Sequence, residues 1–80
     1  MSPDSIRAML DRRPFIPFRI HVGDVAHYDI AKPRMVVIGH VATFIGINRR
    51  DSQSEYFDEP VIVANRHITR LEPLVDEVAN

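Results

Sequence analysis

The chain has 80 residues, the size of one small domain with a thin hydrophobic core. It contains no cysteine, which excludes disulfides, cysteine zinc ligands and a thiol nucleophile. Ten basic and eleven acidic side chains give a net charge of −1, a balance that does not favour general binding to DNA or to a membrane surface. With 45% hydrophobic and 26% charged residues, the composition is typical of a globular domain. No apolar segment reaches the roughly 20 residues that span a membrane, and the first residues lack the apolar core of a signal peptide, so we expect a cytoplasmic protein.

The first predicted element is a short helix over residues 2–12. Ser2 is a suitable N-cap, and Pro3 suits the first helical position. One apolar stripe follows at helical spacing, formed by Ile6, Met9 and Leu10. A helix this short is marginal in water by itself, so the stripe is predicted to pack against the rest of the domain.

Two strictly alternating segments, 18–22 and 26–30, predict a β-hairpin. A two-residue loop at Gly23-Asp24 would mix its apolar and polar faces, whereas a three-residue loop at 23–25 separates them, so we expect the latter. Val25 is the unfavourable residue of that loop, because such loops often need a left-handed conformation. The loop places one apolar face on Phe18, Ile20, Val22, Ala26, Tyr28 and Ile30.

Residues 35–38 and 41–47 predict a second hairpin with a two-residue loop at Gly39-His40. Both of its faces are apolar, which is unusual for a sheet in a domain of this size. One face carries Met35, Val37, Ala42 and Phe44. The other carries the five candidate interface residues Val36, Ile38, Val41, Ile45 and Ile47. Either the N-terminal helix with segment 15–17, or another subunit, is predicted to cover the second face.

The remaining chain predicts a polar loop over 48–60, strands over 61–64 and 67–71 with a bend at Asn65-Arg66, and an acidic tail over 72–80. We expect a single domain over residues 1–80, with a β-barrel-like sheet over 15–71. The predicted fold is mainly β, with an N-terminal helix followed by five or six antiparallel strands in a small barrel or a strongly bent sheet.

Two segments carry a family resemblance. Arg13-Pro-Phe-Ile-Pro-Phe-Arg-Ile-His-Val22 and His67-Ile-Thr-Arg-Leu-Glu-Pro73 resemble a group of small uncharacterised bacterial proteins with a Pro-Phe-x-Pro-Phe-x-Ile-His segment. The chain departs from that group at Gly23-Asp24, where the group has Asp-Gly. The resemblance implies no activity. The order of a capping helix and bent strands is also similar to SH3-like barrels and to the Sm-like RNA-binding fold, which implies RNA as a partner.

The residues give little support to metal binding or catalysis. Metal ligands on one strand face are spaced two residues apart, and no two of the chain's histidines are: His21, His27, His40 and His67. His21 and His27 are expected to meet only in the alternative hairpin register. The acidic segment 51–59 fails the EF-hand template, since Tyr56 replaces the required glycine and Ile62 the required glutamate. The sequence pattern places no catalytic base near any of the chain's serines, which are Ser2, Ser5, Ser52 and Ser54. We predict no metal and no cofactor.

The sequence does not establish a biochemical function, but it suggests three functional hypotheses. The favoured one is a non-catalytic module that binds another protein or assembles with itself through the five candidate interface residues. The alternative is an Sm-like RNA-binding protein that uses Arg66, His67 and Arg70. The third is a small enzyme, which we do not expect, because a thin core leaves little room for a walled pocket.

Overall fold

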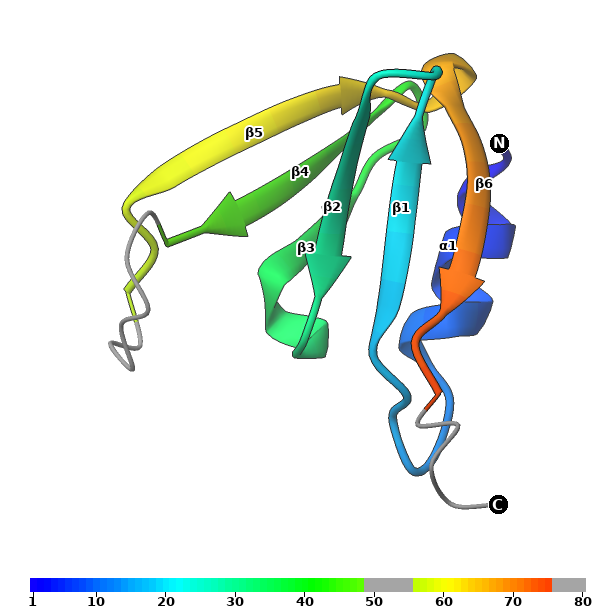
Figure 1. Cartoon of the computed structure of the whole chain (residues 1–80), viewed down its shortest axis with the longest axis vertical. Coiled ribbons are helices and arrows are strands. Elements are labelled where there is room, and N and C mark those ends of the chain that lie inside the picture. The colour runs from blue at the N-terminus through cyan, green and yellow to red at the C-terminus, as the bar shows by residue number, and fades with distance from the viewer. Residues whose placement is uncertain (49–55, 76–80) are drawn as a thin grey trace.

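Ser2 begins the helix α1, which spans Pro3–Leu10 in the computed structural model (Figure 1). The Ser2 hydroxyl accepts a hydrogen bond from the backbone N–H of Ser5, and Pro3 stands in the first turn, where its missing N–H costs nothing. All three residues of the predicted stripe are buried. The predicted helix is therefore confirmed, although it ends at Leu10 rather than at residue 12. The structure describes residues 1–48 and 56–75, and no helix within those residues is long and apolar enough to cross a membrane.

The first sheet contains β1 (Phe18–Val22), β2 (Ala26–Ile30) and β6 (Ile68–Pro73) in the antiparallel order β2-β1-β6. Val22 lies opposite Ala26, as the three-residue loop requires, so the predicted register of the first hairpin is confirmed. Gly23 adopts the left-handed conformation of that loop, with φ of 58°. Because glycine takes this position, Val25 is not strained there.

The second sheet contains β3 (Val36–Ile38), β4 (Ala42–Ile47) and β5 (Glu59–Ala64) in the antiparallel order β3-β4-β5. A 3-10 turn, η1 (Pro33–Met35), leads into it from β2. Ile38 pairs with Thr43, and the Gly39 N–H donates to the Ala42 carbonyl at 2.9 Å, so the loop is His40-Val41. The predicted loop at Gly39-His40 was wrong by one residue. The residues within β3 and β4 kept their predicted faces, because the pairing moves by two positions and side chains alternate with a period of two.

The two sheets do not close into a barrel, so the barrel prediction was wrong, although the mainly β class and the antiparallel strands after a helix are confirmed (Figure 1). β3 has only three residues and follows the turn η1. The strand-to-strand hydrogen bonding is therefore interrupted between β2 and β3. The chain returns to the first sheet through η2 (Asn65–His67), the predicted bend. Figure 1 shows β4 and β5 extending away from the first sheet rather than wrapping around it.

One core joins the helix to the inner faces of both sheets. Ten hydrophobic residues are buried in it: Ile6, Met9, Leu10, Phe18, Ile20, Ile30, Val36, Ile45, Val63 and Ile68. Phe15 packs at its border, edge-to-face on Phe18 with ring centroids 6.1 Å apart. The helix therefore shares this core with the inner face of the second sheet, which it contacts at β3, so the chain itself covers that face, in keeping with one of the two predicted alternatives.

This core changes the assignment of the interface. Val36 and Ile45 are buried within the chain, and Ile38 and Ile47 are partly buried against the core, so these four do not form an outer surface. Only Val41, in the turn between β3 and β4, is exposed. The five residues were chosen on the wrong side of the hairpin, because alternation separates two apolar faces without saying which one the helix covers.

Two further boundaries differ from the prediction. β5 begins at Glu59 rather than at residue 61, and β6 continues to Pro73. Glu72 is therefore a strand residue opposite Arg19 and not part of an acidic tail. Residues 76–80 of the predicted tail lie outside the described residues.

Asn65 connects the elements at the point where the chain leaves the second sheet. Its side chain is 4% exposed; Oδ1 accepts from the hydroxyl of the fully buried Thr43 at 2.7 Å. Its Nδ2 donates to the carbonyls of Gly39 and His40 at 2.9 and 3.1 Å. Its backbone N–H donates to the Val41 carbonyl at 2.7 Å. The Asn65 side chain thus forms hydrogen bonds with both β4 and the β3–β4 turn, and its backbone N–H joins the start of η2 to the same turn. These bonds hold the loop at His40-Val41.

Replacing Thr43 with valine tests this role. Thr43→Val keeps the side-chain shape but leaves Oδ1 of buried Asn65 without its donor, so we expect the free energy of unfolding to fall by about 1–3 kcal/mol. Equilibrium urea unfolding measures the change. Thr69→Val is the matched control, because Thr69 is exposed and its hydroxyl makes only longer bonds, at 3.3 and 3.4 Å. Equal losses in the two variants would contradict the role of Asn65.

Candidate functional site

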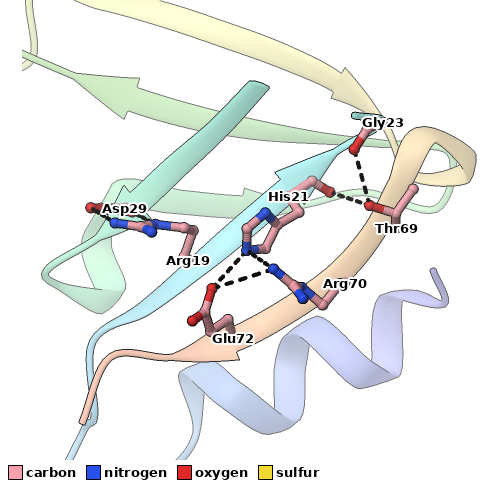
Figure 2. A network of polar contacts seen from close by, with 7 residues as sticks. All are labelled: Arg19, His21, Gly23, Asp29, Thr69, Arg70 and Glu72. Atoms are coloured by element: carbon pink, nitrogen blue, oxygen red, sulfur yellow. Dashed lines mark hydrogen bonds and ion pairs between the residues drawn. The ribbon is translucent and has the colours of Figure 1, made fainter. Parts of the chain in front are cut away.

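The outer face of the first sheet carries polar side chains on all three strands (Figure 2). Alternation sends the apolar residues of β1, β2 and β6 to the core, so the residues between them point outward. The strand registers then bring these outward residues together in cross-strand pairs. The polar set consists of Arg19, His21, His27, Asp29, Arg70 and Glu72.

Arg19 and Asp29 form a two-pronged ion pair between β1 and β2. Nε of Arg19 lies 2.6 Å from Oδ1 of Asp29, and Nη2 lies 3.1 Å from Oδ2. The hydrogen bond from Arg19 lowers the pKa of Asp29, against a smaller opposing effect of desolvation. The same bond raises the pKa of Arg19. Because both side chains are partly exposed, water screens the pair, and it adds little to stability.

His21 lies between two charged residues of the neighbouring strand β6. Its Nε2 is 2.8 Å from Oε1 of Glu72 and 3.0 Å from Nη2 of Arg70. One ring nitrogen cannot donate to the carboxylate and accept from the guanidinium at the same time. We assign the proton to Nε2, because the contact with Glu72 is the shorter one and its acceptor is charged. Donation from His21 lowers the pKa of Glu72; desolvation opposes this, and the charge of Arg70, 3.6 Å away, adds to it.

His21 and His27 face each other across β1 and β2. They are direct partners in the register, with ring centroids 6.0 Å apart. The expectation that they would meet only in the alternative register was wrong, because a pairing of Val22 with Ala26 also pairs the residues one step further from the loop. Within residues 1–48 and 56–75, no three His, Asp or Glu side chains are placed to hold a metal ion.

A β-bulge shapes one end of this polar face. β6 pairs with β1 through Arg70 and Ile68, and the register shifts between them, so Thr69 has no direct partner. The Thr69 hydroxyl donates to the carbonyls of His21 and Gly23, at 3.3 and 3.4 Å (Figure 2). The bulge is thus tied to the β1–β2 turn.

The outer face of the second sheet is apolar. Val37, Phe44 and Ile62 are neighbours in the register and form a row across β3, β4 and β5. Their exposed fractions are 65%, 43% and 63%. In a single chain, the apolar side chains of this row therefore remain in contact with water.

One end of that apolar face is covered by the chain itself. The ring of Phe57 packs over Gly46, where an added Cβ would lie 2.5 Å from the ring, so only glycine fits at this position of β4. The guanidinium carbon of Arg34 lies 5.0 Å from the centre of the same ring. The Phe44 row lies next to this covered end, and a shallow apolar depression separates the two.

The three candidate RNA-binding residues do not form a single row. Arg66 and His67 are exposed on η2, whereas Arg70 lies on the outer face of the first sheet beside His21. RNA binding by these residues stays a prediction.

Other predicted features are placed as follows. Ser2 and Ser5 belong to the helix cap, with their hydroxyl oxygens 3.4 Å apart. Ser52, Ser54 and most of the acidic segment 51–59 fall outside the described residues. Tyr56 is exposed, and His40 is exposed in the β3–β4 turn.

The chain matches no protein-family model, no curated protein and no solved structure. Its function must therefore be argued from its own residues.

Sequence reasoning missed the pairs on the first sheet. The register of the first hairpin places Arg19 opposite Asp29 and His21 opposite His27, so the signal was present in the residue numbers. The contacts of His21 with Arg70 and Glu72 depend on the pairing of β1 with β6, which are separated by 45 residues of chain; no local pattern predicts that pairing.

The depressed pKa values of Asp29 and Glu72 predict an acid-sensitive fold. A group with a lowered pKa stabilises the folded state above its ordinary value, here 3.8 for Asp29 and 4.5 for Glu72, and this contribution is lost as pH falls through the lowered pKa. We therefore expect Glu72→Gln to lose less stability than the unmodified chain between pH 5 and pH 2. Denaturant unfolding over that range measures it. Asp4→Asn, which removes a carboxylate of the distant helix, is the control, and an identical pH dependence in both variants would contradict the assignment.

Proposed function

We propose that the chain is a non-catalytic module that assembles with a second copy of itself through the outer face of the second sheet. The observation that carries the proposal is the exposed row of Val37, Phe44 and Ile62. Contiguous apolar surface of this kind marks an interaction site on a folded protein. Covering it removes branched aliphatic and aromatic side chains from water, at roughly 25 cal/mol per Å² of buried apolar area.

The edges of the same sheet are less suited to a contact. β3 has only three residues, and Pro60 lies in the edge strand β5, where its nitrogen has no hydrogen to donate. Short edge strands and edge prolines both oppose the addition of another strand. The expected contact is therefore face to face, with two three-stranded sheets stacked about 10 Å apart.

A second copy is the occupant that fits this face most directly. A self-complementary contact about a twofold axis needs one kind of surface only, and here that surface has an aromatic side chain at its centre. The net charge of −1 opposes association only weakly. Stacking also gives a small domain a second buried layer, which its thin core lacks.

Light scattering after size exclusion tests the proposal. We expect a dimer for the unmodified chain and a folded monomer for Ile62→Glu, because the variant buries a charge between the stacked faces. Val25→Glu is the matched control. Val25 is 94% exposed on the β1–β2 turn, so the variant should remain dimeric.

Three results would contradict the proposal: a monomeric unmodified chain at about 100 μM, an Ile62→Glu variant that keeps the dimer, or a Val25→Glu variant that loses it. A monomer would leave the face to a partner of another kind. Far-ultraviolet circular dichroism of both variants separates dissociation from unfolding.

A further inference from the structure

An open hollow lies at the bulged end of the first sheet, on its polar side. Its volume is about 490 Å³, within the range of small-molecule sites, roughly 300–1,000 Å³. The β1–β2 turn forms one wall, and β6 contributes Thr69 and Arg70. The remaining polar lining is His21, His27 and Asp24. The hollow is on the first sheet, so nothing about it depends on the self-assembly proposed for the second.

Two of the lining side chains, Arg70 and His27, are exposed to solvent. Because the Nε2–H of His21 donates to Glu72, Nε2 cannot accept a hydrogen bond from Arg70. The remaining partner of the Arg70 guanidinium is then Glu72, in an ion pair of 3.6 Å. The Arg70 guanidinium, 64% exposed, therefore has N–H groups available to a ligand. His27 is exposed and makes no hydrogen bond within the described residues.

The charges around the hollow favour an anion over a cation. Arg70 carries a permanent positive charge 3.0 Å from the ring nitrogen of His21, so a metal ion at that nitrogen would be repelled. Glu72 already has two partners, in His21 and Arg70. Asp24 is the acidic side chain that lines the hollow, and it opposes an anion.

We propose that this hollow binds a phosphate group, as the free ion or as a small phosphate monoester. Arg70 donates to two phosphate oxygens through its planar guanidinium, and His27 donates to a third from β2, on the opposite side of β1 from Arg70. His21 holds Glu72, and Thr69 fixes the turn, so both act as positioning residues for Arg70 and the rim.

The experiment is an NMR titration of the ¹⁵N-labelled chain with inorganic phosphate. A parallel titration uses sodium chloride at the same ionic strength. We expect saturating shifts of the Gly23, Thr69 and Arg70 amides with phosphate and none that saturate with chloride. Arg70→Gln should weaken the phosphate affinity at least about tenfold, the effect of losing one charge-assisted contact. Asp24→Asn should strengthen it, because the opposing carboxylate is gone.

Arg66→Gln is the matched control. It removes the same charge four residues earlier, on η2, at a residue that does not line the hollow, so the variant should bind phosphate as the unmodified chain does. A third titration with a single-stranded RNA oligomer at low salt distinguishes a phosphodiester ligand.

The proposal is overturned by any of four results. These are no saturable shifts with phosphate, equal shifts with chloride, unchanged affinity in Arg70→Gln, or a stronger loss in Arg66→Gln than in Arg70→Gln. RNA binding that depends on Arg66, without saturable phosphate binding at the hollow, would instead support the RNA-binding alternative.

Discussion

The buried side-chain amide of Asn65 holds the end of the second sheet from which the chain turns toward the first. It accepts from Thr43 in β4 and donates to two carbonyls of the β3–β4 turn, at the residue where the chain leaves β5 for the first sheet. A buried amide that finds partners for each of its polar atoms specifies one geometry, because any other leaves a polar group unpaired away from water. The point where the chain leaves the second sheet is therefore held by hydrogen bonds as well as by apolar packing.

The outer faces of the two sheets differ in character. α1 packs on the inner sides of both sheets and completes a single core with them. The outer side of the first sheet is polar, with side chains paired across strands by charge and hydrogen bonding. The outer side of the second sheet is apolar, and apart from the end under Phe57 it is exposed. The two faces are thus suited to different ligands, a polar one on the first sheet and an apolar surface on the second.

The sequence was sufficient for the parts of the fold that local patterns determine. Cap, proline and apolar spacing predicted α1, and alternation with Gly23 in the loop predicted the first hairpin in its correct register.

The sequence was not sufficient where contacts between residues far apart in the chain determine the structure. The β3–β4 loop follows from Asn65, more than 20 residues away, and the break between the sheets follows from the short β3. The interface prediction failed for a related reason, since two apolar faces look alike until the helix is placed on one of them. At the candidate site, the pairs within the first hairpin could have been predicted from its register, whereas those involving β6 could not.

The apolar outer face of β3-β4-β5 is the proposed binding surface for a second copy of the chain. An isotope-filtered NOE experiment on an equimolar mixture of ¹³C-labelled and unlabelled chain measures this contact directly, because it detects only protons on different molecules. If two such faces stack, we expect intermolecular contacts between the Ile62 methyl groups and the Phe44 ring, and none from the outer face of the first sheet. Intermolecular contacts from His21 or Arg70 instead, or no intermolecular contacts at all, would contradict it.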